Sequence, residues 1–198
     1  MEEQIRQMLG KTQTIGKSLF CFDEIDSTNT YAKQLAVEGA EHGTVILADY
    51  QTAGRGRMNR EFQSPRGKGI YLSVLLRPKV PVERLMCVTA LAGVAVCNAV
   101  ENVCGIRPGL KWPNDPVLGN RKICGILTEL VMTPEGKPIL VLGIGINVLQ
   151  EEHDFSPEIR PIATSIAVET GIFIDRCALT VELLRQLELL LLLMIKVV

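Results

Sequence analysis

The chain has 198 residues, of which 47% are hydrophobic, 22% are charged and nine are aromatic. This length suffices for one domain with a sizeable core, and the composition excludes a disordered or collagen-like chain. The formal net charge of −1 at pH 7 argues against a general nucleic-acid surface, because non-specific affinity for nucleic acid comes from many contacts between basic side chains and phosphates.

The charge is unevenly distributed along the chain. Residues 55–68 contain five arginines and lysines against one acid, Glu61, so this segment carries +4 and the remainder carries −5. Such a loop is suited to holding a small anion. Two histidines and six scattered cysteines argue against a zinc site, a Ser/His/Asp triad and a disulfide framework. The cysteines are predicted to be small buried thiols in a reducing compartment.

The first half of the chain is predicted to alternate strands and helices around one long loop. Strands are predicted at 18–25, 44–50 and 70–77, and helices at 30–39, after the N-cap Ser27, and at 82–104. Residues 51–69 hold five glycines or prolines together with the basic cluster. They are predicted to form a functional loop, since loops this long in compact domains are usually functional or disordered.

The second half is predicted to contain closely spaced strands and two final helices. Strands are predicted at 109–112, 115–118, 121–132 and 137–148, hairpin turns at 118–121 and 133–136, and helices at 163–170 and 178–195. This order predicts an α+β fold with a mixed, largely antiparallel sheet backed by helices. The last helix has leucines at helical spacing (183, 184, 187, 190 and 191), and its apolar run is too short to span a membrane.

Two segments carry charged groups suited to binding an anion. Residues 54–60 begin like a dinucleotide-binding G-x-G-x-x-G motif, but Asn59 replaces the third glycine, which leaves arginines on a flexible backbone. Residues 111–115 and 121–125 place lysines, an arginine and a carboxylate on adjacent strands. A solvated loop and an exposed charged hairpin remain alternatives. Trp112, the single tryptophan, is predicted to anchor the core.

Two further segments carry polar groups beside glycines or at a helix start. Residues 143–148 place two glycines inside a strand, where a ligand or another backbone can approach closely, and Asn147 offers both a donor and an acceptor for an adenine edge. Residues 26–29 place more polar side chains at a helix start than one N-cap needs, which suits a polar head group. A strand bulge and a simple cap are the alternatives.

These segments follow one another in the order of a known family. The matching residues are Ser27 to Asn29, Tyr50 to Arg57, Ser64 and Pro65, Gly69 to Ser73, Lys111 to Asp115, Arg121 to Leu130, and Gly143 to Asn147. Together they resemble biotin–protein ligase over about residues 19–171. The resemblance implies a class II synthetase-like fold of the biotin/lipoyl ligase type. Residues 1–17 are polar and lack the apolar region of a signal peptide, so a cytoplasmic location is expected. The implied substrates are biotin and ATP with Mg²⁺, which give biotinyl-5′-AMP, and the biotin then passes to a lysine of a carboxylase's biotin carboxyl carrier domain.

The resemblance also implies a role for each candidate residue. The biotin ureido ring is expected to meet Ser27, Thr28, Asn29 and Gln51, with Gly54 and Gly125 allowing close approach. A loop of Arg55, Gly56 and Arg57 is expected to close over the carboxylate and phosphate, and Asn147 to contact adenine. The catalytic set is Lys122, which bridges carboxylate and phosphate, together with Arg57, Lys111 and Asp115. Asp115 is expected to hold magnesium or to orient the incoming carrier lysine.

The predicted organisation is an N-terminal arm (1–18), a catalytic domain (19–177) and a C-terminal helix (178–198), with no N-terminal DNA-binding domain and no C-terminal β-barrel domain. Two other interpretations remain open: a module that binds biotin or biotinyl-AMP without transferring it, and a lipoate-type acyl ligase. No nucleic-acid or membrane partner is expected, and a homodimer is compatible with the sequence.

Overall fold

The computed structural model describes residues 2–10, 14–78, 82–133 and 136–196, and it has two sheets and five α-helices in these ranges. The helices are α1 (Glu2–Leu9), α2 (Thr28–Val37), α3 (Val82–Cys104), α4 (Ile166–Thr170) and α5 (Arg176–Lys196), with the 3-10 turns η1 (Arg57–Asn59) and η2 (Glu152–Asp154). The strands are β1 (Leu19–Phe22), β2 (Val45–Ala48), β3 (Gly69–Leu76), β4 (Gly109–Lys111), β5 (Asp115–Leu118), β6 (Arg121–Lys122), β7 (Cys124–Met132) and β8 (Pro138–Asn147).

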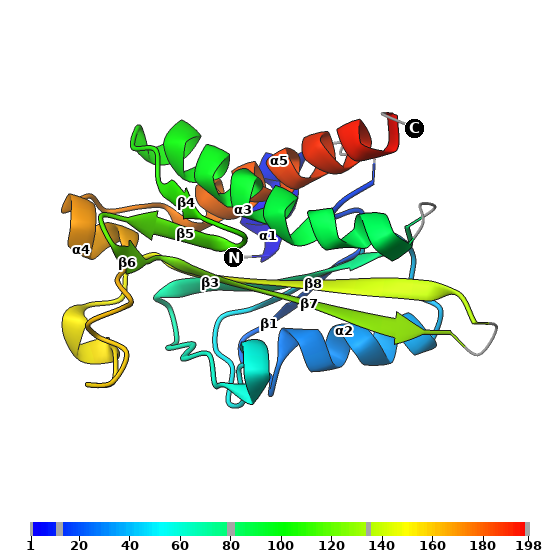
Figure 1. Ribbon diagram of the computed structural model, residues 1–198, viewed down its shortest axis with the longest axis horizontal. Helices are drawn as coiled ribbons and strands as arrows, with labels where there is room; N and C mark the ends of the chain where they lie inside the picture. The colour runs from blue at the N-terminus through cyan, green and yellow to red at the C-terminus, as the bar shows by residue number, and fades with distance from the viewer. Residues whose placement is uncertain (1, 11–13, 79–81, 134–135, 197–198) are drawn as a thin grey trace.

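The main sheet has the strand order β1-β2-β3-β8-β7, in which β1 and β2 are parallel and the other pairs are antiparallel. Helix α2 covers one face, and α1, α3 and α5 cover the other (Figure 1). Strands β4, β5 and β6 form a small second sheet beside the main one. The expected mixed, largely antiparallel sheet backed by helices is therefore confirmed.

The central strands are apolar because both faces of the sheet are covered. Every residue of β3 is buried, and apolar residues of β8 and of α3 join them in the main core. The stretch Cys87–Cys104 of α3 is apolar and long enough to cross a membrane by length and composition alone. It packs against α5 and the sheet, however, with Ala92, Ala95 and Val96 fully buried, as expected for a core helix.

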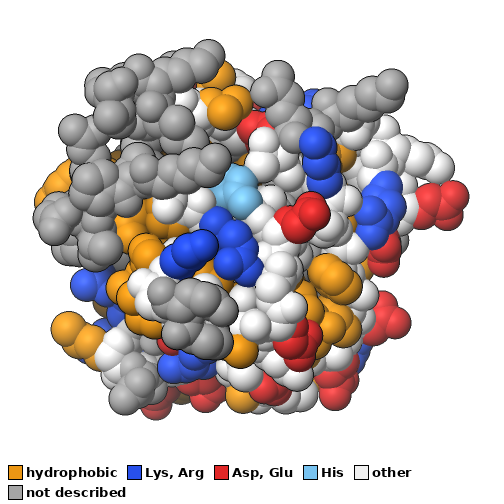
Figure 2. Space-filling view, turned by 90° about the vertical axis from the view of Figure 1, so that its right-hand side faces the viewer, with side chains coloured by type: hydrophobic (Ala, Val, Ile, Leu, Met, Phe, Trp, Pro, Cys, Tyr) orange, Lys and Arg blue, Asp and Glu red, His pale blue; other side chains and the backbone are white. Residues whose placement is uncertain are grey.

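Both ends of the described chain contribute to the same core. Ile5 and Leu9 of α1 are buried in one cluster with Leu183 and Leu187 of α5. The leucine face predicted for the last helix is thus occupied by this chain's own residues. Figure 2 shows the right-hand end of the molecule of Figure 1, where basic, acidic and hydrophobic side chains are intermixed.

Three expectations about local structure are wrong. Residues 121–132 form two strands in different sheets, because the chain crosses between the sheets at Ile123, whose N–H bonds Pro116. Trp112 is 78% exposed and does not anchor the core. Cys87 is exposed, whereas Cys97, Cys124 and Cys177 are buried as expected. The hairpin turn at 118–121 is confirmed, and residues 134 and 135 of the other predicted turn lie outside the described residues.

Candidate active site

A cavity of about 460 Å³ opens over the β7–β8 side of the main sheet, between the start of α2 and the small sheet. Its volume is typical of small-molecule sites. The cavity brings together eleven of the thirteen residues predicted for the site: Ser27, Thr28, Asn29, Gln51, Arg55, Gly56, Arg57, Asp115, Lys122, Gly125 and Asn147. Segments up to 120 residues apart in sequence therefore form one site.

An uncharged hydrogen-bonding wall forms one part of the cavity. Ser27 caps α2 by accepting from the Thr30 N–H, so the next residues begin the helix with their side chains over the sheet. The Thr28 N–H donates to Gln51 Oε1 (2.8 Å), and Gln51 Nε2 donates to Ser64 Oγ (2.8 Å). These bonds hold the Gln51 amide in one orientation, ready to recognise a neutral polar head group.

Glycines shape the floor of the cavity. A Cβ at Gly143 would overlap Asn29 Oδ1, and a Cβ at Gly145 would overlap the Phe62 ring. At Gly125, the neighbour of Gly145 across the sheet, a Cβ would lie 2.8 Å from Phe62 Cε2. The glycines that were predicted to admit a ligand or a backbone therefore already make room for an asparagine amide and an aromatic ring.

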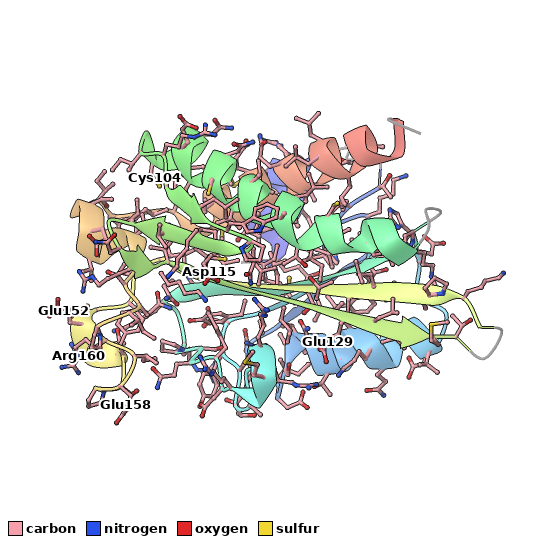
Figure 3. All side chains as sticks on the ribbon, viewed as in Figure 1. Cys104, Asp115, Glu129, Glu152, Glu158 and Arg160 are labelled. Atoms are coloured by element: carbon pink, nitrogen blue, oxygen red, sulfur yellow. The ribbon has the colours of Figure 1, made fainter. Side chains whose placement is uncertain are left out.

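Cations form another part of the lining, and two of them are held by adjacent residues of the chain. Lys122 Nζ lies 2.6 Å from Asp115 Oδ1, across the β5–β6 pair. Arg57 Nη1 donates to Asn114 Oδ1 (3.0 Å). In Figure 3, Asp115 lies near the start of β7, away from Glu129 further along this strand. The site is thus neutral and polar around α2 and cationic beside the small sheet.

Strand β8 runs along the cavity from the polar wall to the cationic part. Gly143 faces Asn29, Gly145 faces Phe62, and the N–H of Asn147 donates to the carbonyl of Ile123, next to Lys122. Four residues of antiparallel strand span about 14 Å. The cavity can therefore bind a ligand with a neutral polar head near Gly143, an apolar middle against Phe62 and an acidic tail near Asn147.

The cations of the basic loop, residues 55–68, fall into two groups: some line the cavity and others bond to the rest of the protein. Arg66 pairs with Glu24 (2.6 Å) and Lys68 with Asp154 (2.5 Å), so these cations hold the loop to the body of the protein. The hydrogen bond from Asp154 raises the pKa of Lys68, which keeps the pair charged. Arg55 and Arg57 line the cavity. The charge counted from the sequence is thus only partly available to a ligand.

Two predicted residues lie outside the cavity lining. Lys111 is exposed on β4, although its strand neighbour Asp115 lines the cavity. Gly54 lies behind the lining, where its carbonyl accepts from the Phe62 N–H (2.9 Å) and a Cβ would meet Ser64 Oγ at 2.8 Å. Gly54 therefore shapes the loop that carries the ring.

Asn147 lies in the cavity wall with its amide engaged. Its Nδ2 donates to the carbonyl of Thr164 (3.0 Å), and its Oδ1 accepts from Gln150 Nε2 (3.2 Å). Gln150, 1% exposed, also donates to the hydroxyl of Tyr71 (3.3 Å). These bonds fix the Asn147 amide and leave its second N–H and second lone pair for an adenine edge, so the predicted contact with adenine stays a prediction.

Three residues of the site were missed from sequence. Phe62 covers the glycine floor, Asn114 holds Arg57, and Glu129 bonds Asn29 from behind the wall. Asn114 lies within a motif that was singled out, and its buried Nδ2 has no partner in the described structure. Its place in that motif was the signal available in the sequence, whereas the unbonded donor beside Arg57 is evident only in the fold, where a buried amide in a cavity wall needs an acceptor.

The cavity offers few carboxylates that could hold magnesium. Among the described residues, the one group of three ligand-type side chains close enough to share an ion is Glu151, His153 and Asp154, and none of these lines the cavity. Asp115 does line it, and Lys122 engages one of its two oxygens. One carboxylate fits Mg²⁺ where substrate phosphates supply further oxygens.

The fold and the cavity define an α+β domain whose cavity has a neutral polar part and a cationic part, an arrangement suited to a small ligand with a polar head and an acidic tail. The model of the biotin/lipoate A/B protein ligase family matches residues 21–147. The chain belongs to this family, which confirms the expected class II synthetase-like fold of the biotin/lipoyl ligase type.

Two curated relatives and one solved structure are closely similar. The chain is 41% identical over 187 residues to the bifunctional ligase/repressor BirA of Bacillus subtilis, and the match covers 94% of this chain and 57% of that protein. It is 35% identical over 193 residues to the biotin–[acetyl-CoA-carboxylase] ligase of Mycobacterium tuberculosis, covering 94% and 69%. The structure of biotin protein ligase from Aquifex aeolicus in complex with biotin and ATP matches with a TM-score of 0.77 at 36% identity, over 88% of this chain and 70% of that one.

Proposed function

We propose that this chain activates biotin with ATP and transfers it to a lysine of a carrier protein. In the first step a biotin carboxylate oxygen attacks the α-phosphate of ATP, which gives biotinyl-5′-AMP and pyrophosphate. In the second step the lysine amine attacks the acyl carbon, an amide bond forms, and AMP leaves. The relatives named for biotin ligation support this proposal, although the chain spans little more than half the length of the Bacillus subtilis protein.

The observation that carries the proposal is the order of groups along the cavity. Biotin has a neutral ureido ring, an apolar ring system and chain, and a terminal carboxylate. The wall of Thr28 and Gln51 is neutral and rich in donors and acceptors, the Phe62 ring is apolar, and Lys122 is cationic. The cavity thus presents matching chemistry in the same order as the substrate.

Activation requires two anions to approach each other. A carboxylate and a phosphate oxygen about 4 Å apart repel by about 4 kcal/mol at an effective dielectric of ~20. Lys122 and Arg57 both line the cavity and are already oriented by the adjacent residues Asp115 and Asn114. Because these cations are fixed before the substrates arrive, they offset the repulsion without reorganising at the moment of reaction. The chain contributes positioning and charge, and the nucleophiles belong to the substrates.

Transfer requires the carrier lysine to lose a proton before it attacks, since its ordinary pKa is near 10.4. Asp115 lines the cavity beside Lys122, and its side chain is 26% exposed. Lys122 engages one of its two carboxylate oxygens, so the other is not engaged by Lys122. We propose that this oxygen orients the incoming amine. When Mg²⁺ accompanies ATP, Asp115 would be the residue that holds it, and the ion would neutralise phosphate charge.

We also propose that residues 19–177 form the catalytic unit, with the arm (1–18) and the last helix (178–198) as its supports. The acceptor is proposed to be the biotin carboxyl carrier domain of a carboxylase. All six cysteines are free thiols, which supports a reducing, cytoplasmic location. A homodimer, and the expectation that no nucleic acid binds, stay predictions that light scattering and a polynucleotide titration at several salt concentrations would check.

Thermal unfolding with competing acids tests the choice of substrate. A ligand that binds only the native state raises Tm, and biotin near 100 Kd would stabilise by about 2.7 kcal/mol. We expect biotin to raise Tm and lipoate to leave it unchanged. The reverse order would favour the lipoate-type ligase. Protection by biotin without ATP-dependent labelling of a carrier domain would indicate a binding module that transfers nothing.

A further inference from the structure

A buried chain of hydrogen bonds leads from the basic loop to the amide of Asn147. It begins where the Tyr71 hydroxyl donates to the carbonyl of Pro65 (3.0 Å). Gln150 Nε2 donates to the Tyr71 hydroxyl (3.3 Å) and to Asn147 Oδ1 (3.2 Å). Asn147 Nδ2 donates to the carbonyl of Thr164 (3.0 Å), where the chain ends. Tyr71 and Gln150 are each 1% exposed and Asn147 is 6% exposed, so water competes little for these bonds.

The two carbonyls at its ends fix the direction of every bond in this chain. A peptide carbonyl can only accept, so Tyr71 must donate its one hydrogen to Pro65. Burial raises the pKa of Tyr71, so the hydroxyl keeps this hydrogen at neutral pH. The Tyr71 oxygen is then an acceptor, which turns the NH₂ group of Gln150 toward Tyr71 and Asn147. Asn147 Oδ1 therefore accepts from Gln150, while Asn147 Nδ2 donates to Thr164.

Local structure explains how Tyr71 and Gln150 reach Asn147. Gly69 is the partner of Asn147 across the β3–β8 pair, and a Cβ at Gly69 would overlap the Tyr71 ring. The glycine therefore lets the Tyr71 hydroxyl lie at this level of the sheet. Ser165, the N-cap of α4, donates to the carbonyl of Gln150 (2.6 Å) and holds the backbone from which the Gln150 amide extends. Gln150 is thus fixed against Asn147, although it does not line the cavity itself.

Gln150 carries a cost that packing alone would not require. Its Oε1 is buried and has no hydrogen-bond partner among the described residues. An unpaired buried carbonyl is unfavourable, and a methionine side chain of the same length would fill the space without this cost. The N–H groups of Gln150 are therefore the chemistry that this position supplies, and one of them is bonded to Asn147.

An amide of fixed direction distinguishes purines by the group at carbon 6. Adenine carries an amino group there, which donates, whereas guanine carries an oxygen, which accepts, and hypoxanthine carries the same oxygen. Asn147 Oδ1, oriented by Gln150, can accept from the amino group and repels the oxygen. A flipped Asn147 amide would suit the oxygen. The flip would, however, set Nδ2 against Gln150 Nε2 and Oδ1 against the Thr164 carbonyl, so two hydrogen bonds would become two unfavourable contacts.

We infer that Gln150 is a positioning residue that orients the Asn147 amide so that the site selects ATP over nucleotides with a 6-oxopurine base. This inference rests on the proposed function and on the predicted contact between Asn147 and adenine. It assigns base selectivity to a side chain that does not line the cavity.

Two substitutions weaken this orientation, and a third is a matched control. Q150M keeps the side-chain length and removes both donors, so a flipped Asn147 amide meets one unfavourable contact, at Thr164, instead of two. Y71F removes only the hydroxyl, which leaves the Gln150 amide free to turn together with Asn147. The control Q186M makes the same chemical change as Q150M on α5, where Gln186 bonds Asn98 and does not line the cavity.

The experiment measures biotin-dependent exchange of pyrophosphate into ATP and into ITP, with kcat and KM for each nucleotide, in the wild type and the three variants. We expect the wild type to prefer ATP in kcat/KM and Q150M to lower this preference by about tenfold or more, chiefly through a higher KM for ATP. Y71F should lower the preference in the same direction, and Q186M should leave it unchanged. Calorimetry should show nearly unchanged biotin affinity in Q150M, because the wall of Thr28 and Gln51 is untouched. Near-ultraviolet circular dichroism checks that each variant is folded.

Three outcomes would overturn the inference: a wild type that uses ATP and ITP equally well, an unchanged preference in folded Q150M or folded Y71F, or an equal loss of preference in Q186M. If Q150M does not fold, the comparison of Y71F with the wild type decides. A wild type that shows no biotin-dependent exchange with either nucleotide would contradict the proposed function itself, so the two failures are distinguishable.

Discussion

Replacing Lys122 with methionine removes one charge and keeps most of the side-chain volume. Lys122 Nζ lies 2.6 Å from Asp115 Oδ1, and its side chain is 39% exposed. At an effective dielectric of ~20, a unit charge about 4 Å from the reacting anions contributes about 4 kcal/mol. At about 1.4 kcal/mol per tenfold change, this corresponds to a loss of about 10³-fold in the rate of adenylation. Biotin affinity should change far less, because the wall of Thr28 and Gln51 is untouched.

Biotin-dependent exchange of pyrophosphate into ATP measures this step without the carrier protein. The matched control is K137M, which removes the same charge from an exposed lysine just before β8, at the end of that strand away from Asn147. We expect K137M to match the wild type and K122M to lose exchange while calorimetry still detects biotin binding. Exchange by K122M within tenfold of the wild type would refute the electrostatic reasoning.

Three further predictions follow from other features. W112A should change the free energy of unfolding in urea by less than about 0.5 kcal/mol, because Trp112 is 78% exposed; a loss above ~2 kcal/mol would contradict this. G145A should displace the Phe62 ring and weaken biotin binding at least tenfold by calorimetry, and unchanged affinity would show that the ring position is unimportant. D154N should cost about 1–3 kcal/mol at pH 7, because the bond that Lys68 donates at 2.5 Å loses its negatively charged acceptor. Although burial opposes ionisation of Asp154, that bond lowers its pKa below the ordinary 3.8, so its stabilisation is present above about pH 4 and lost as the pH falls through the folded-state pKa. Urea unfolding of the two proteins should therefore converge as the pH falls through the folded-state pKa of Asp154, and a difference that stays constant as the pH falls would contradict the assignment.

The sequence predicted helices and strands well where apolar residues repeat with one clear period or where a helix cap marks the start. The apolar helix predicted at 82–104 has the same ends in the structure, and Ser27 is the N-cap that its position indicated. The break at Ile123 was not predictable, because a continuous strand-like segment looks the same in sequence whether it stays in one sheet or crosses to another. Trp112 was misplaced because large aromatic size alone does not determine burial.

The candidate site was predictable as far as its motifs were continuous in sequence. Glu129 was missed because its partners Asn29 and Arg55 come from other segments, and only the folded sheet brings them together. Phe62 was missed because nothing in the sequence of a loop shows that its ring lies over Gly125 and Gly145. Contacts between distant segments thus carry the part of the site that the sequence did not show.

The joining of biotin to the α-phosphate of ATP in this cavity is the step on which the proposed function depends. The most direct measurement is to incubate the chain with biotin and ATP labelled at the α-phosphate, and to separate the products by chromatography and mass spectrometry. We expect biotin-dependent formation of labelled biotinyl-5′-AMP together with pyrophosphate in the wild type, and the loss of this product in K122M. Biotin binding with no labelled adenylate in the wild type would contradict the proposed function.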